Sequence, residues 1–169
     1  MRIRNVKRED MREFIDVYMK SYENLEEYAY NKRNEVKRYF KWLLYRDSNG
    51  FFVYEVGNSA VGFIACDANW FSYFENCVVG EIHEIFVLPE MRGKGIGKAM
   101  LLRGLAYFEE RDLSIAELWV GITNYDAQSF YLKMQFERAE IVGKWMRMRK
   151  ILNAARGQHR LKLNDAVRQ

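Results

Sequence analysis

Three glycines fall within five residues of the segment PEMRGKGIGKAM, and this feature constrains the fold more than any other in the chain. The segment follows an apolar run over residues 78–88, which reads as a β-strand and is ended by Pro89, the single proline of the chain. A helical apolar pattern begins directly after it and covers residues 95–110. The sequence therefore predicts a strand, a glycine-rich turn and a helix in direct succession.

Such a turn directs several backbone N–H groups and the positive end of a helix at one place, where phosphate groups bind. Two familiar phosphate loops do not match it. A Walker A loop needs glycine at Arg92 and serine or threonine at Ala99, and the dinucleotide fingerprint needs a further glycine at Lys98 or Met100. The pattern that remains is R-x-x-G-x-G, from Arg92 to Gly97.

The rest of the chain alternates between strand-like and helical patterns. Strands are expected at residues 2–7, in two runs within 50–68, and at 78–88, 115–122, 136–142 and 144–150; helices are expected at 8–22, around 36–44, at 95–110 and around 127–134. This order predicts one α/β domain, a mixed sheet with helices on both faces. Strands 78–88 and 115–122 should be parallel, because a helix connects them by a right-handed crossover.

Composition places the chain among soluble globular proteins, with 49% hydrophobic and 30% charged residues in a length of 169. It has no apolar run near the ~20 residues that a membrane span needs, and the segment MRIRNVKRED is unlike a secretory signal, so we expect a cytoplasmic protein. Cys66 and Cys77 should be free thiols. His83 and His159 lie far apart, and no paired metal-ligand motif occurs, so no metal is expected.

The net charge of +4 comes from the C-terminal end. Residues 144–169 contain eight Lys/Arg and one acid, which leaves residues 1–143 slightly acidic. A basic tail can contact nucleic acid, but a solvated terminus is the more common case. We therefore expect residues 151–169 to form a basic tail or a short helix, without nucleic acid as a partner.

Two motifs resemble those of the GNAT superfamily of N-acetyltransferases. The segment EIHEIFVLPEMRGKGIGKAMLLRGL is similar to the family's acetyl-CoA-binding motif, whose R/Q-x-x-G-x-G/A loop matches Arg92, Gly95 and Gly97. The segment NYDAQSFYLKMQF is similar to a second motif, with matches at Asn124, Ala127, Phe130, Tyr131 and Phe136. Gln135 stands where the family usually has glycine, which should alter only the end of the helix.

The resemblance extends over residues 1–150, which it identifies as an acetyltransferase domain. It implies a GNAT-like mixed, mostly antiparallel central sheet of six to seven strands, flanked by about four helices on both faces. It also implies acetyl-CoA as the acetyl donor, and no metal. Homodimers are frequent in the family, so a homodimer is one expected state.

The resemblance further implies which residues hold and use acetyl-CoA. Loop amides would bind the pyrophosphate, Asn124 would contact the pantetheine, and the amide of Val87 would bind the carbonyl oxygen. Tyr131 would protonate the leaving thiolate, because a tyrosine pKa of ~10 keeps the phenol protonated. The implied cofactor-binding residues are Phe86, Val87, Leu88, Arg92, Gly93, Lys94, Gly95, Ile96, Gly97, Lys98, Asn124 and Tyr131.

The general base stays open among Glu81, His83 and Glu84, on the strand before Val87. By resemblance, Glu81 stands where several family members place a catalytic glutamate, and His83 where others carry a histidine. Strand alternation puts Glu81 and His83 on one face together with Val87, and Glu84 on the opposite face unless a bulge intervenes. Deprotonation of an alkylammonium, with a pKa near ~10.4, needs such assistance.

The expected acceptor is a primary amine of a small molecule or a peptide. Residues 21–35 mix Glu23, Glu26 and Glu27 with tyrosines, and residues 69–76 are aromatic. Carboxylates and aromatic rings suit a cationic amine, although a solvated helix face and core packing explain the same pattern. A protein lysine or N-terminal acetyltransferase, and an inactive acetyl-CoA-binding module, are the alternatives.

Overall fold

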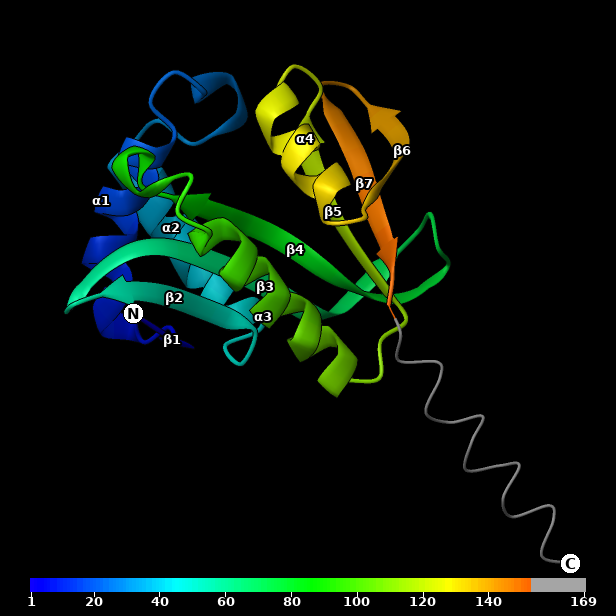
Figure 1. The fold of residues 1–169 in the computed structure, drawn as a ribbon, viewed down its shortest axis with the longest axis horizontal. Coiled ribbons are helices and arrows are strands. Elements are labelled where there is room, and N and C mark those ends of the chain that lie inside the picture. The colour runs from blue at the N-terminus through cyan, green and yellow to red at the C-terminus, as the bar shows by residue number, and fades with distance from the viewer. Residues whose placement is uncertain (153–169) are drawn as a thin grey trace, which may run out of the picture.

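A computed structural model describes residues 1–152 of the chain (Figure 1). The tail or helix expected from residue 151 lies outside the described residues from residue 153 onward. The strands are β1 (Arg2–Asn5), β2 (Phe51–Val56), β3 (Ser59–Ser72), β4 (Cys77–Val87), β5 (Ile115–Gly121), β6 (Glu137–Val142) and β7 (Trp145–Ile151). The α-helices are α1 (Met11–Ser21), α2 (Arg33–Arg46), α3 (Ile96–Glu110) and α4 (Tyr125–Lys133), and the 3-10 turns are η1 (Arg8–Asp10), η2 (Glu26–Tyr28) and η3 (Pro89–Met91).

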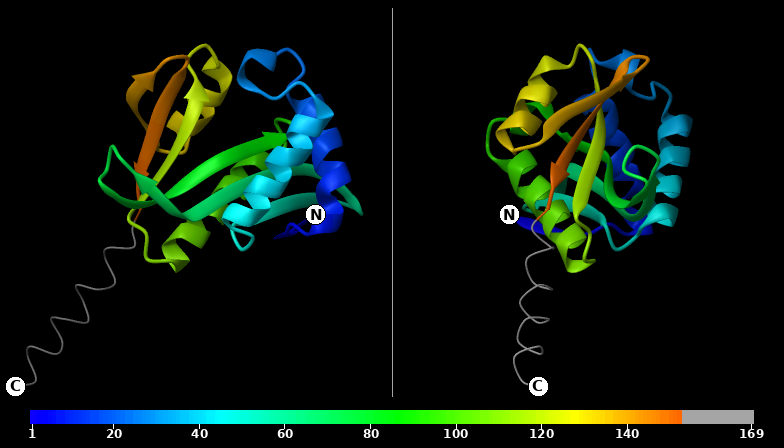
Figure 2. Two further views of the ribbon diagram at one scale, coloured as in Figure 1. Left: turned by 180° about the vertical axis from the view of Figure 1, so that it is seen from behind. Right: turned by 90° about the vertical axis from the view of Figure 1, so that its right-hand side faces the viewer.

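One seven-stranded sheet runs in the order β1-β2-β3-β4-β5-β7-β6. Every neighbouring pair is antiparallel except β4 and β5, which are parallel and joined through α3. The mixed, mostly antiparallel sheet and the parallel pair predicted from the sequence are thus confirmed. The helices cover opposite faces of the sheet. Helices α1 and α2 lie on one face, and α3 and α4 lie on the other (Figure 2).

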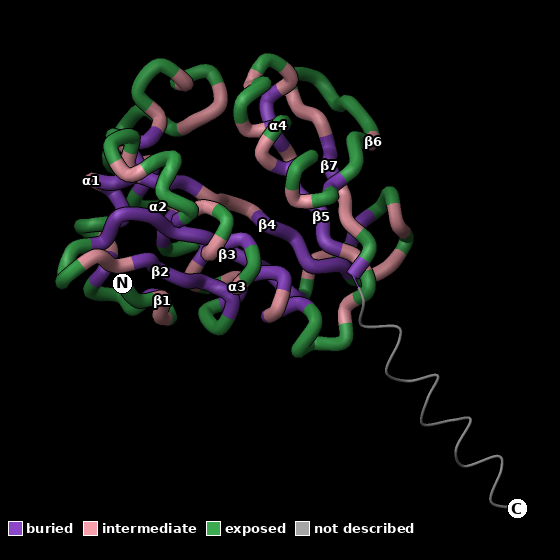
Figure 3. Tube along the Cα trace, in the orientation of Figure 1, coloured by how far each residue is buried: buried purple, intermediate pink, exposed green. Residues whose placement is uncertain are grey.

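Two hydrophobic cores result, one on each face of the sheet. The core under α1 and α2 is rich in phenylalanine, with Phe14, Phe40, Phe51 and Phe63 all at most 1% exposed. The core under α3 and α4 contains Met100, Leu101 and Phe108 from α3 and Tyr131 from α4, among other buried residues. Figure 3 shows that β3, β4 and β5 are largely buried, with a half-buried stretch in β4. Each such side chain contributes about 1.5–3 kcal/mol by burial.

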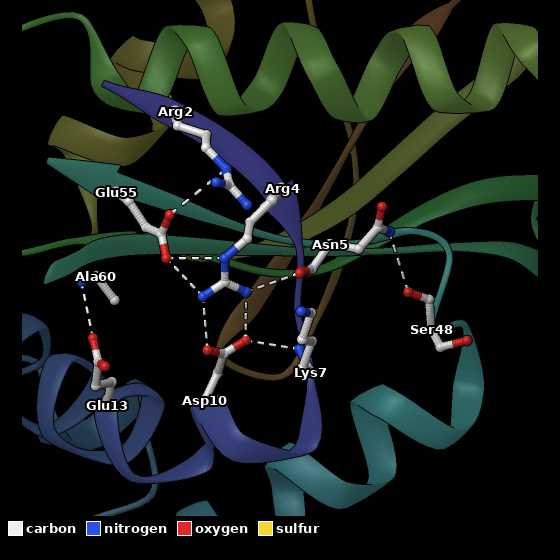
Figure 4. A network of polar contacts seen from close by, with 9 residues as sticks. All are labelled: Arg2, Arg4, Asn5, Lys7, Asp10, Glu13, Ser48, Glu55 and Ala60. Atoms are coloured by element: carbon white, nitrogen blue, oxygen red, sulfur yellow. Dashed lines mark hydrogen bonds and ion pairs between the residues drawn. The ribbon is translucent and has the colours of Figure 1, made fainter. Parts of the chain in front are cut away.

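The first helix is fixed to the sheet by polar contacts around Arg4 (Figure 4). Its guanidinium pairs with Asp10 at 2.7 Å, just before α1, and with Glu55 of β2 at 2.6 Å. Within the first turn of α1, Glu13 accepts a hydrogen bond from the amide of Ala60 on β3. These contacts set the direction of α1, and so the position of its C-terminal end at the site described below.

The parallel pair is short, and this opens the sheet. Strands β4 and β5 pair only between Gly80–Ile82 and Ala116–Leu118. Beyond that point β4 continues to Val87 and β5 to Gly121, and Figure 1 shows the two strands diverging toward the top of the view. Past the paired residues, the backbone edges of β4 and β5 that face each other are not hydrogen-bonded to one another.

Within residues 1–152, no helix is long and apolar enough to cross a bilayer. Across that same part of the chain, no group of three or more His, Cys, Asp or Glu is arranged to hold a metal ion. Cys66 and Cys77 are free thiols.

Candidate active site

The glycine-rich turn joins β4 to α3 through η3. Gly93 and Gly95 have φ angles of 73° and 79°, in the left-handed region that side chains other than glycine's adopt at a cost. Gly95 is the N-cap of α3 and has no side chain to satisfy the first amides. The first bond within the helix runs from the Ala99 amide to the Gly95 carbonyl, at 3.0 Å. The amides of residues 96–98 therefore remain free for an anion at the helix N-terminus.

The edge of β4 that faces the opening carries the backbone groups of Val87. The neighbouring Leu88 amide donates to the Val61 carbonyl on β3, at 2.9 Å. Because successive residues of a strand direct their backbone groups to opposite edges, those of Val87 face away from β3. The Val87 carbonyl accepts a hydrogen bond from Nε of Arg92 at 3.1 Å, and Nη2 of Arg92 donates to the Ser21 carbonyl at 2.6 Å. Arg92 thus ties the glycine-rich turn to the end of α1.

A cleft of about 1170 Å³ occupies the opening between β4 and β5. Its walls come from the end of α1 and the segment after it, from β4, from the end of β5, from α4 and from the turn between β6 and β7. It extends to Arg92 and Gly97 of the glycine-rich turn. The glycine-rich turn and the acidic, aromatic segment after α1 therefore border the same cleft.

A β-bulge interrupts β4 inside this cleft. Ala65 of β3 lies opposite Glu84, but the next residue, Cys66, lies opposite Ile82. His83 is therefore an extra residue on β4, with no partner of its own on β3. From this point onward the two faces of β4 are exchanged relative to strict alternation.

The bulge corrects one expectation from the sequence. Ile85 and Val87 pack in the core under α3, whereas Glu84 meets Tyr22 just after α1 on the opposite face. The prediction that Glu81 and His83 share a face with Val87 is therefore wrong. Because the bulge adds one residue, Glu81, His83 and Glu84 all lie on the α1/α2 face and all line the cleft.

Glu84 receives a hydrogen bond from the hydroxyl of Tyr22. Burial raises the pKa of Glu84 to about 7, although the Tyr22 hydroxyl acts in the opposite direction. A carboxyl group with such a pKa exchanges its proton near neutral pH. Glu84 thus has both the position in the cleft and the protonation behaviour of a general base.

His83 is held in place by a hydrogen bond and two indole rings. Its Nε2 lies 3.0 Å from Oδ2 of Asp67, which is fully buried and also pairs with Arg46 at 2.7 Å. The imidazole contacts Trp42 and Trp70, with ring centroids 4.8 and 5.0 Å away. The ring nitrogen that lies nearest to Asp67 is therefore occupied.

Glu81 lies deeper, with 3% of its surface exposed. It stands directly opposite Glu117 of β5 in the parallel pairing. Burial and the neighbouring Glu117 raise its pKa well above the ordinary value. Its Oε2 atom has no hydrogen-bond partner within the described part of the chain.

Helix α4 contributes Tyr131 and Asn124. Tyr131 is 7% exposed and lines the cleft, and burial, followed by the charge of Glu84, raises its pKa above the ordinary value. Its phenol therefore keeps its proton at neutral pH. Asn124 is the N-cap of α4, and its Oδ1 accepts the Ala127 amide at 3.2 Å. The side-chain nitrogen of Asn124 is the part left for a ligand in the cleft.

The segment between α1 and α2 closes over the cleft, and we call residues 22–30 the strap. Its Tyr28 hydroxyl lies 2.5 Å from Oγ1 of Thr123, and the Tyr28 ring lies 5.3 Å from that of Trp145. Nζ of Lys144 donates to the strap at the Glu27 carbonyl. Figure 1 shows the strap beside the N-terminal end of α4. The strap therefore bridges the two sides of the cleft.

The cleft brings together several of the residues that the sequence predicts to bind the amine acceptor. Glu23 and Glu27 line the cleft, but Glu26 does not. Of the aromatic stretch 69–76, Trp70 alone lines the cleft, and Tyr73 is 90% exposed.

Sequence reasoning missed three contributors. Glu117 reads as an ordinary strand residue until pairing sets it beside Glu81. Asp67 becomes relevant through its long-range contact with His83. Gly121 had a detectable signal, a glycine at the end of an apolar strand. A Cβ there would lie 2.4 Å from the Tyr28 ring, so glycine is what allows the strap to close.

Comparison with known proteins gives matches to N-acetyltransferases. Residues 11–136 match the acetyltransferase (GNAT) family. A curated relative from Archaeoglobus fulgidus, named an uncharacterized N-acetyltransferase, is 52% identical over 143 residues, which are 85% of this chain and 97% of the relative.

Solved structures share the fold. A crystal structure of a Pyrococcus horikoshii OT3 protein has a TM-score of 0.83 and 42% identity, over 90% of this chain and 98% of that one. The paia N-acetyltransferase from Thermoplasma acidophilum, solved in complex with coenzyme A, has a TM-score of 0.75 and 22% identity, over 89% of this chain and 98% of that one. This second likeness concerns the fold.

Proposed function

The chain belongs to the acetyltransferase (GNAT) family and is an N-acetyltransferase, and on this premise we propose that it transfers acetyl from acetyl-CoA directly to a primary amine of a small molecule or peptide. One observation carries the proposal. The opening between β4 and β5 forms a single cleft that contains free helix amides, the Val87 backbone edge, Tyr131 and a carboxyl group with a pKa near neutrality.

The residues at the glycine-rich turn fit a coenzyme A diphosphate. The free amides of residues 96–98 and the positive φ angles of Gly93 and Gly95 form a cradle that no side chain fills. Arg92, Lys94 and Lys98 supply positive charge. Phe86 and Leu88 flank Val87 on the strand edge that would hold the pantetheine. Acetyl-CoA supplies a thioester, whose carbonyl carbon is activated toward an amine.

The amide of Val87 is the group best placed to stabilise charge. It faces the cleft and would donate to the thioester oxygen, where negative charge develops during attack. A preorganised donor of this kind lowers the activation free energy of acetyl transfer by about 2.7–4 kcal/mol.

Glu84 is the general base that the geometry supports. Its pKa of about 7 allows it to accept a proton from the acceptor ammonium, directly or through water, and to release it again. The hydroxyl of Tyr22 orients its carboxyl group. Glu81 is more deeply buried, with a pKa raised well above the ordinary value, and the nearer nitrogen of His83 is occupied by Asp67, so both are weaker candidates.

Tyr131 is the proposed general acid. Its phenol is protonated, has no hydrogen-bond partner within residues 1–152, and belongs to the same cleft as Glu84. It would donate its proton to the sulfur that leaves. Glu23 and Glu27 of the strap, together with the tyrosines around them, provide a rim that attracts a cationic acceptor.

A screen of primary amines with detection of the coenzyme A thiol tests the proposal. We expect turnover with at least one amine, and a loss of about 10²–10⁴ in kcat for Glu84→Gln and for Tyr131→Phe, without a matching change in the KM for acetyl-CoA. Glu84→Gln should also remove the rise of kcat/KM with pH around 7.

Three parallel variants sharpen the assignment. Glu109→Gln removes an exposed charge on α3, away from the cleft, and should leave kcat unchanged. If Glu81→Gln or His83→Gln, rather than Glu84→Gln, abolishes turnover with every amine, the base is that residue. Full activity of Tyr131→Phe would exclude the proposed acid.

A further inference from the structure

The inner end of the cleft contains a buried carboxyl group that the proposed mechanism does not use. Glu81 is 3% exposed, yet it lines the cleft, and its Oε2 has no hydrogen-bond partner among residues 1–152. A buried polar atom without a partner costs free energy and is uncommon in folded proteins. Its position in a ligand cleft indicates that the missing partner is supplied by a ligand.

The charged groups around Glu81 already have partners. Glu117 of β5 pairs with Nη1 of Arg147 at 2.7 Å and accepts a hydrogen bond from Ser72 at 2.8 Å. The same arginine, from β7, also pairs with Glu75 and Glu140.

Asp67 of β3 is likewise satisfied. It pairs with Arg46, at the end of α2, and with His83 of β4. Within the described residues, Glu81 is the buried carboxyl group of this cluster that has no cation of its own. The one polar atom of this cluster that lacks a hydrogen-bond partner within residues 1–152 is thus Oε2 of Glu81.

Aromatic walls make this place suitable for an organic cation. Trp70 and Trp119 both line the cleft. Trp119 follows Glu117 by two residues and so lies on the same face of β5. Indole rings attract ammonium groups through their π-electrons, and the attraction is greater where water is excluded.

We propose that the inner end of the cleft, at Glu81, Trp70 and Trp119, binds a second ammonium group of the acetyl acceptor. The inference rests on the proposed acetyl transfer and deepens it, because it names the acceptor class as a molecule with two amines. One amine is acetylated beside Glu84, and the other donates to Oε2 of Glu81. Glu84 and Glu81 lie opposite Ala65 and Asp67, which are two residues apart on β3, and this corresponds to about 7 Å in an extended strand.

Binding at this subsite has a proton signature. In the free protein, burial and the neighbouring carboxylates of Glu117 and Asp67 raise the pKa of Glu81, while Arg147 and Arg46 are already paired with those carboxylates and His83 with Asp67. A bound ammonium favours the ionised form of Glu81. Protons held by Glu81 then leave to the buffer, so a diamine should bind with release of more protons than a monoamine of the same length.

The first experiment uses the unmodified protein. Diamines from diaminopropane to diaminohexane are compared with monoamines of equal chain length, as acceptors and as ligands in calorimetry in two buffers of different ionisation enthalpy. We expect kcat/KM to be at least about tenfold higher for the preferred diamine than for its monoamine, which corresponds to ~1.4 kcal/mol. Equal values for the two series would overturn the proposal.

A peptide arm separates two sources of the second ammonium. Ala-Lys-Ala is compared with the peptide in which norleucine replaces lysine. An advantage for the lysine peptide that exceeds the advantage for any diamine assigns the subsite to peptide acceptors. The reverse order assigns it to small diamines.

The variant Glu81→Gln separates the subsite from a catalytic role. We expect it to lower kcat/KM about tenfold for the diamine, to change the monoamine value by less than about twofold, and to abolish the extra proton release. Glu109→Gln is the matched control and should change none of these. Equal losses of kcat for both series would make Glu81 a catalytic group and overturn the subsite.

Failure of the proposed function looks different from failure of the subsite. If the protein neither binds acetyl-CoA nor releases coenzyme A with any amine, the acetyl transfer itself is refuted, and the subsite with it. If Glu81→Gln does not fold, the comparison of diamine and monoamine on the unmodified protein still decides the question.

Discussion

At the scale of single residues, Glu84 shows how one inserted residue changes the chemistry of a strand. Without the bulge at His83, strand alternation would send the Glu84 carboxyl group into the opposite core. With it, the group meets the Tyr22 hydroxyl in the cleft, and burial raises its pKa to about 7. A residue that simple alternation removes from the site thereby becomes the base that we propose.

The raised pKa of Glu84 predicts how stability depends on pH. Between pH 4.5 and about 7 the folded protein keeps a proton on Glu84 that the unfolded chain has lost, so the free energy of unfolding contributed by this group falls as pH rises. The total fall is on the order of 3 kcal/mol, and it levels off above the folded pKa. We expect Glu84→Gln to remove this decline in urea unfolding measured at several pH values.

Glu109→Gln is the control for that series, because Glu109 is exposed and the substitution should leave the decline in place. An unchanged slope for Glu84→Gln would show that the raised pKa belongs to another group.

At the scale of elements, the turn before α3 depends on two glycines with positive φ. Gly95→Ala places a side chain at φ 79° and should cost about 1–2 kcal/mol of stability, as well as weaken acetyl-CoA binding by moving the cradle. Gly97→Ala is the matched control. Its φ is not positive, a Cβ there would lie 3.7 Å from Phe130, and alanine is the better helix former.

Thermal unfolding without ligand tests this pair. A lower Tm for Gly95→Ala together with an unchanged or higher Tm for Gly97→Ala is the expected result. Equal losses at both positions would contradict the special role of the left-handed N-cap.

The strap depends on contact between Tyr28 and Gly121. A Cβ at Gly121 would lie 2.4 Å from the Tyr28 ring, so Gly121→Ala should displace the strap and raise the KM for the amine several-fold, while the KM for acetyl-CoA stays the same. In the Tyr28→Ala background the same substitution should have little further effect, because the ring it collides with is absent. Additive effects of the two substitutions would show that the strap does not close through this contact.

At the scale of the whole molecule, local patterns predicted the order of elements and long-range pairing determined the site. The glycines, Pro89 and the apolar periodicity were sufficient for the strand–turn–helix unit and for the parallel β4 and β5. The bulge at His83 could not be predicted from the sequence, because it arises from the pairing register between β4 and β3. The pairing of Glu81 with Glu117 was hidden in the same way, since 36 positions separate the two residues in the chain.

The cleft itself illustrates this limit. Its walls come from α1, β4, β5, α4 and the β6–β7 turn, which only the closed fold brings together. Each wall taken alone reads as an ordinary amphipathic element. Their convergence at the place where β4 and β5 separate is what makes a binding site of them.

A crystal structure of the protein with coenzyme A tests the central claim most directly. The account predicts the diphosphate on the amides of residues 96–98 and the pantetheine along the free edge of β4, with its thiol end near Val87 and Tyr131. Coenzyme A bound elsewhere, or a cleft without it at saturating concentration, would contradict the account.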